Sequence, residues 1–200
     1  MKTDLIRPAL IAAAALAAAV LTSCTSTTTS QVTLEYRPPL PGQVPKGAPV
    51  SAVGIFNDKR GGDGATYLGT VRDVTRGAFF DLNTRVPVAQ VVANAFGHGM
   101  DARGMLTRRR NPRTVIAGDV LALYTQKLVR PYAEAKVRVV VIRPGGQQLF
   151  ARVFRAEAEL PATPANQSDA ESLRLLASQA LAQVVNTALD DPQVRAALAQ

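Results

Sequence analysis

The chain has 200 residues, a formal net charge of +8, one cysteine and one histidine. A single cysteine excludes a disulfide within the chain, and one cysteine with one histidine excludes the usual zinc ligand sets. The length suits one domain better than two.

The N-terminal segment has the pattern of a bacterial export signal. A short start with two basic residues precedes an apolar run over residues 8–20, which is shorter than the roughly 20 residues of a membrane-spanning helix. Leu-Thr-Ser-Cys at 21–24 then matches a lipobox. The sequence therefore predicts a cleaved signal peptide over residues 1–23 and lipidation of Cys24, with enough acyl chains for stable anchoring.

The predicted location is the periplasmic side of the outer membrane. The chain is similar here to bacterial lipoproteins, which are kept in the inner membrane mainly when aspartate follows the cysteine, whereas Thr25 follows it here. Removing residues 1–23 lowers the net charge by one, from +8 to +7. Export excludes nucleic acid as a partner, which leaves another envelope protein or an anionic envelope group on lipid, lipopolysaccharide or peptidoglycan. No cofactor is expected.

Residues 24–49 are predicted to form a tether between the lipid and the domain. Residues 25–31 are all polar, and five prolines follow between positions 38 and 49, which favour extended geometry. A flexible coil of this length spans very roughly 25 to 30 Å. Residues 32–36 alternate apolar and polar side chains, so the alternative for them is an edge strand. Residues 50–200 are predicted to form a single domain.

The domain is predicted to combine strands and helices. Apolar patterns indicate strands at 53–56, 67–71, 114–125, 132–142 and 149–160, with a hairpin turn at Pro144-Gly145-Gly146. Apolar spacings of three and four indicate a helix from Pro87 to Gly104, a long helix capped by Ser168 and Glu171, and a short helix capped by Asp191.

The predicted fold class is α+β. An antiparallel sheet of about four strands with two amphipathic helices on one face satisfies the apolar stripes. The pattern of 149–160 changes phase midway, so a bulge near Val153-Phe154 is expected to keep its apolar residues on one face.

These elements resemble the YajG-type proteobacterial lipoproteins. The likeness lies in Val32-Thr33-Leu34-Glu35-Tyr36 before Pro38-Pro39, in Asn57-Asp58-Lys59-Arg60, in Tyr67-Leu68-Gly69, and in the helix from Pro87. The chain departs from the family at Gly97-His98-Gly99. The resemblance implies an outer-membrane lipoprotein with no established enzymatic activity. The layout is also similar to the auxiliary lipoproteins of envelope ABC transporters.

Candidate catalytic residues are few. His98, between two glycines, is interpreted as a partly exposed residue near a helix end. The carboxylates in turn-like sequence are expected to be solvated: Asp58, Asp63, Asp73 and Asp81. The glycine-rich 61–64 lacks the lysine of a phosphate loop and is interpreted as a flexible turn. Asp119 interrupts an apolar strand, which predicts an edge or bulge position, or a pair with Arg138 or Arg152.

The densest charge in the chain lies between the first helix and the next strand: Arg103, Arg108, Arg109, Arg110 and Arg113. One interpretation is a solvated loop. The other is a contact for anionic envelope groups through Arg108, Arg109, Arg110 and Arg113, because guanidinium groups bind phosphate and carboxylate bidentately.

The sequence as a whole predicts a non-enzymatic outer-membrane lipoprotein with a periplasmic binding domain. The alternative is an auxiliary lipoprotein subunit of an envelope ABC-type transport complex. A hydrolase would require Asp58, Asp81 or Asp119 to meet His98 in one pocket.

Overall fold

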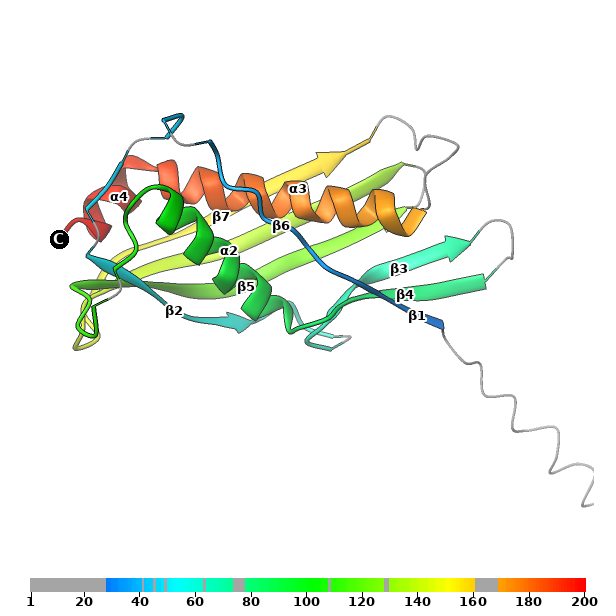
Figure 1. Cartoon of the computed structure of the whole chain (residues 1–200). Coiled ribbons are helices and arrows are strands. Elements are labelled where there is room, and N and C mark those ends of the chain that lie inside the picture. Colours follow the sequence, from blue (N-terminus) through cyan, green and yellow to red (C-terminus); the bar gives the residue numbers. More distant parts are fainter. Residues whose placement is uncertain are drawn as a thin grey trace, which may run out of the picture.

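The structure, a computed structural model, describes residues 28–40, 42–44, 46–48, 50–62, 64–73, 78–107, 109–127, 130–160 and 169–200. It is an α+β fold, as predicted (Figure 1). Its strands are β1 (Thr28–Val32), β2 (Ser51–Asp58), β3 (Tyr67–Asp73), β4 (Ala78–Thr84), β5 (Thr114–Lys127), β6 (Pro131–Ile142) and β7 (Gln148–Glu159). Its helices are α2 (Val88–Ala102), α3 (Asp169–Asp190) and α4 (Pro192–Leu198).

The larger sheet has the strand order β2-β5-β6-β7. β2 lies parallel to β5, and the other two pairs are antiparallel. The apolar alternation of β6 is confirmed, because one face of the strand is buried throughout: Ala133, Ala135, Val137, Val139 and Val141. The hairpin between β6 and β7 is confirmed as well.

The bulge predicted near Val153-Phe154 is wrong. Val153 lies opposite Arg138, and Phe154 lies opposite Val137, in unbroken register. Phe154 is buried while Val153 is 44% exposed. The strand therefore keeps its alternation and leaves a valine in solvent, since shifting the register by one residue would move every side chain to the other face.

A smaller sheet with the order β1-β4-β3 is the main element that the sequence did not predict. β3 and β4 form an antiparallel pair, and β1 lies parallel to β4 on its other side. Gly69 of β3 lies directly on Thr125 of β5, where a Cβ on the glycine would overlap the carbonyl oxygen of the threonine. The absence of a side chain at position 69 lets the two sheets approach each other here.

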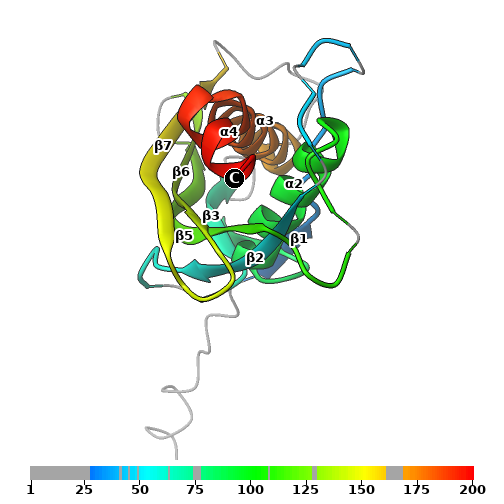
Figure 2. The same ribbon diagram turned by 90° about the vertical axis from the view of Figure 1, so that its left-hand side faces the viewer.

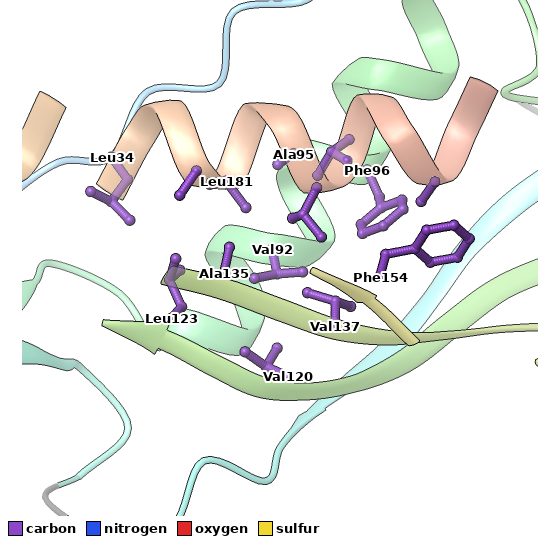
Figure 3. Packing of buried hydrophobic residues seen from close by; sticks show 14 of the residues in the cluster. Leu34, Val92, Ala95, Phe96, Val120, Leu123, Ala135, Val137, Phe154 and Leu181 are labelled. Atoms are coloured by element: carbon purple, nitrogen blue, oxygen red, sulfur yellow. The ribbon is translucent and has the colours of Figure 1, made fainter. Parts of the chain in front are cut away.

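The helices lie inside the curve of the larger sheet, on one of its faces (Figure 2). α2 ends at Ala102, and Gly104 two residues later has a φ of +64°, which stops the helix as predicted. All the apolar positions predicted on α3 are buried: Leu173, Leu176, Ala177, Ala180, Leu181, Val184, Ala188 and Leu189. Side chains from the sheet, α2 and α3 meet between these layers, among them Val137, Val92 and Leu181 (Figure 3).

The helix termini agree with the sequence where they are described. The carboxylate of Asp191 accepts hydrogen bonds from the backbone N–H groups of Gln193 and Val194, which confirms it as the cap of α4. Ser168, the other predicted cap, lies outside the described residues. Among the described helices, none is long and apolar enough to cross a membrane.

Candidate functional site

Part of the predicted tether belongs to the folded domain. Residues 28–32 form β1, and Val32 and Leu34 are buried in the core. The backbone N–H of Glu35 donates to Oγ of Ser178 at 3.1 Å. Residues 28–36 are therefore part of the domain and not of a tether, because 28–32 pair with β4 and the apolar side chains of Val32, Leu34 and Tyr36 pack on the core. Of the alternative edge strand at 32–36, only Val32 belongs to a strand. Cys24 lies outside the described residues and is separated from β1 by three residues in the sequence.

A buried arginine fixes this segment to the two long helices. Arg103 is 0% exposed and forms two parallel hydrogen bonds of 2.9 Å with the carboxylate of Asp190. Its other Nη donates to the carbonyl of Gly99 at 3.0 Å. Oδ1 of Asn186 accepts from Arg103 at 3.2 Å and from the hydroxyl of Tyr36 at 2.8 Å. The network joins the N-terminal segment, α2 and α3 at one point.

The network corrects the interpretation of Arg103. Arg103 was grouped with the other arginines of the basic cluster because it lies near them in the sequence. In the structure its charge is buried and paired with Asp190. Burial alone lowers the pKa of this guanidinium, but the hydrogen bonds with Asp190 raise it overall, so Arg103 stays charged. Burial also raises the pKa of the Tyr36 hydroxyl, against the lowering effect of Arg103. Arg103 is a structural residue.

The remaining arginines of the cluster behave differently. Arg109, Arg110 and Arg113 are exposed, and within the described residues none of them has an ion-pair partner. Arg108 lies outside the described residues. We call Arg109, Arg110 and Arg113 the basic loop. It connects α2 with the first residue of β5 and lies at the end of the domain opposite the start of β1 (Figure 1).

The turn between β6 and β7 lies at the same end as the basic loop (Figure 1). It adds Arg143, whose guanidinium donates to the side-chain carbonyls of Gln147 at 3.0 Å and Gln200 at 2.9 Å. These partners are uncharged, so they leave its positive charge uncompensated. The end of the domain remote from β1 is therefore basic.

The outer face of the larger sheet is polar and well paired. Asp119 accepts from Arg138 at 3.4 Å and from the amide of Asn57 at 3.2 Å, which confirms the predicted pair with Arg138. Arg152 has another partner, Asp191, at 2.6 Å. Asp119 is thus a paired carboxylate on a face of the sheet that water reaches.

A second polar group on this face surrounds Glu134. The Tyr124 hydroxyl donates to its carboxylate at 2.8 Å, and Arg155 pairs with it at 2.8 Å. Burial, followed by the bond to Glu134 and its charge, raises the pKa of Tyr124 well above its usual value of 10.0. This group is a cross-strand network of the sheet.

Two hollows of similar size lie on the domain. A cleft of about 700 Å³ lies where β3 crosses β5, with Tyr67, Phe79 and Tyr124 in its lining. A groove of about 690 Å³ lies between the segment 32–37 and α2. Both have the volume of a small-molecule site.

The catalytic candidates do not meet in either hollow. His98 is exposed and lines the groove, but Asp58, Asp81 and Asp119 are not among the lining residues. Asp58 pairs with Arg60 at 2.7 Å, which lowers the pKa of its carboxyl, and Asp81 accepts from the hydroxyl of Thr70 at 3.0 Å. Within the described residues there is no group of three or more His, Cys, Asp or Glu side chains that could hold a metal ion.

Arg60, which was not predicted to have a role, holds the start of the glycine-rich turn in place. Arg60 donates to both oxygens of Asp58 and to the backbone carbonyls of Tyr67 and Leu123, the latter at 3.1 Å. It therefore joins the turn to β5. The only signal in the sequence is the pair Asp58 and Arg60, two residues apart.

Comparison with known proteins identifies the fold. No family model and no curated protein matches the chain. The crystal structure of protein XCC0632 from Xanthomonas campestris, of family DUF330, is similar with a TM-score of 0.59 and 14% identity, over 84% of this chain and 96% of that chain. An uncharacterized protein gives a TM-score of 0.49 at 11% identity, over 80% and 95%.

A third similar structure is lipoprotein GNA1162 from Neisseria meningitidis, with a TM-score of 0.27 and 13% identity, over 70% of this chain and 99% of that chain. At these identities and scores, only the likeness to XCC0632 bears on this chain, and what it shows is a shared fold. None of the three is named as a YajG-type protein, so that resemblance stays a prediction.

Proposed function

We propose that the chain is a lipid-anchored protein of the bacterial envelope that acts by binding rather than by catalysis. The observation that carries this proposal is the position of Cys24, the lipobox cysteine, which only three residues separate from Thr28, the first residue of β1. Thr25 after the cysteine favours the outer membrane as the site of anchoring.

The short connection limits how far the domain can lie from its anchor. A fully extended chain covers at most about 3.3–3.6 Å per residue, so the four steps from Cys24 to Thr28 reach at most about 14 Å. The start of β1 would therefore lie close to the bilayer, whereas a fully extended tether of 25 residues would reach about 85 Å.

The basic loop lies far from this anchor. β5 has 14 residues, runs from the basic loop toward the smaller sheet, and is about 43 Å long at a rise of 3.3 Å per residue. A domain anchored at β1 would thus hold its exposed arginines away from its own membrane. Guanidinium groups in that position can form bidentate hydrogen bonds with the carboxylates of peptidoglycan, which we propose as the partner.

The test is sedimentation of the lipidated protein, purified in detergent, with isolated peptidoglycan. Arg109→Glu/Arg110→Glu should lose binding, because two attractive contacts become repulsive. Arg85→Glu/Arg130→Glu, which changes two exposed arginines elsewhere by the same net charge, should bind as the wild type does. Wild-type binding should also fall as salt shortens the screening length from about 10 Å toward 3 Å.

Failure of the wild type to sediment with peptidoglycan at low salt would contradict this partner. Co-purification with an inner-membrane ATPase or a substrate-binding protein would favour the auxiliary subunit of a transport complex instead. Equal binding by both double variants would mean that total charge, rather than the basic loop, drives the interaction.

A further inference from the structure

We infer that the start of β4, beside the start of β1, contacts the surface of the bilayer that carries the acyl chains of Cys24, with Phe79 as the contacting side chain. This inference rests on the lipidation in the proposed function, and it adds a membrane-binding surface and an orientation. It follows from the strand register, the length of chain between Cys24 and β1, and the exposure of one aromatic residue.

The register places the start of β1 beside the start of β4. Thr28 of β1 lies opposite Phe80 of β4, and Asp73 of β3 lies opposite Ala78 of β4. Because β1 and β4 are parallel, the first residue of β1 lies two positions from the first residue of β4. The start of β4 and the start of β1 therefore lie at the same end of the domain (Figure 1).

The short length of chain between Cys24 and Thr28 then keeps this end of the domain close to the membrane. Cys24 lies at most about 14 Å from Thr28 along an extended chain. A cysteine acylated in the leaflet that faces the domain would keep Thr28, and with it the neighbouring Phe80, within about that distance of the membrane surface. The other end of the domain, with the basic loop, would lie at the far end of β5.

Phe79 is the side chain suited to this contact. It is 59% exposed, whereas Leu82 on the same strand is fully buried. A single exposed apolar residue is ordinary on a soluble domain. The exposure of Phe79 indicates a contact only because the residue lies next to the proposed anchor. Phenylalanine is one of the side chains, with tryptophan and leucine, by which protein segments insert at the boundary between headgroups and acyl chains.

The chain contains no tryptophan, which makes a direct test simple. Phe79→Trp introduces a single fluorescent indole near the start of β4, and Leu40→Trp introduces one at a residue that is 66% exposed in the segment between β1 and β2. Full-length lipidated variants are reconstituted in vesicles with brominated acyl chains. Equal melting temperatures of both variants and the wild type show that neither substitution disturbs the fold.

The expected result is that brominated lipid removes most of the emission of Phe79→Trp, with the maximum at shorter wavelength, while Leu40→Trp keeps its emission. Equal, water-like emission of both variants in protein whose mass shows acylation would overturn the membrane contact alone. A mature chain without acyl groups would overturn the proposed lipidation. Quenching of Phe79→Trp in such a chain would still support the membrane contact of Phe79, because that contact would then form without the lipid anchor.

Discussion

Thr28 and Phe80 lie opposite each other in the parallel pair of β1 and β4. This pair makes the residues that follow the lipobox part of the smaller sheet, and it turns a predicted flexible tether into a short connection. A lipid on Cys24, as proposed above, would place this end of the domain next to the bilayer.

Asp190→Ala should be destabilising. It would leave the buried guanidinium of Arg103 without its carboxylate, which costs about 3–5 kcal/mol in a fully buried pair; Asp190 is 40% exposed, so water can partly replace it and the cost should lie below that range. Asp101→Ala is the matched control, because Asp101 is exposed and has no ion-pair partner in the described part of the chain; it should change the free energy of unfolding by less than about 0.5 kcal/mol. Denaturant unfolding measures both. Equal effects would contradict the assigned role of Arg103.

Leu181→Ala should cost about 2–5 kcal/mol, as large-to-small changes in a core do, because Leu181 is buried between α3 and the sheet (Figure 3). Leu175→Ala on the same helix should cost much less, since Leu175 is 41% exposed. Urea titrations of the two variants give the comparison. A Leu181→Ala variant as stable as the Leu175→Ala variant would mean that α3 packs through another face.

The sequence predicted the elements whose apolar period is regular and whose ends carry strong signals. The buried face of β6, the stop at Gly104 and the Asp191 cap are all confirmed. Each of these depends on neighbours within a few residues, which is the range over which periodicity and capping act.

The elements that the sequence missed depend on distant partners. β1 forms only because β4 lies beside it, and the polar composition of residues 28–31 gives no local strand signal. Arg103 is buried because Asp190 lies next to it, 87 residues away along the chain. The bulge at Val153 was wrong for a related reason, because the register of β7 on β6 is regular there and shifts instead at Leu149, near the turn.

The stability of the domain should fall in alkaline solution, in part through Tyr124. The pKa of this hydroxyl is raised in the folded state above its usual 10.0, first by burial and then by Glu134. The unfolded chain therefore loses the proton first, so the contribution of Tyr124 is complete below pH 10 and decreases as the pH rises above it. Tyr124→Phe should reduce this loss.

The measurement is chemical denaturation between pH 8 and pH 11 for the wild type and Tyr124→Phe. At pH 8 the variant should be less stable by about 1 kcal/mol, because the hydrogen bond to Glu134 is lost. Parallel pH profiles for the two proteins would contradict the assignment to Tyr124.

Lipidation of Cys24 is tested most directly by labelling cells with a radioactive fatty acid, followed by separation of inner and outer membranes. The wild type should carry the label, have the processed size and fractionate with the outer membrane. Cys24→Ser should carry no label and remain unprocessed. An unlabelled wild-type protein would contradict the lipid anchor, and with it the placement of the starts of β1 and β4 at the membrane.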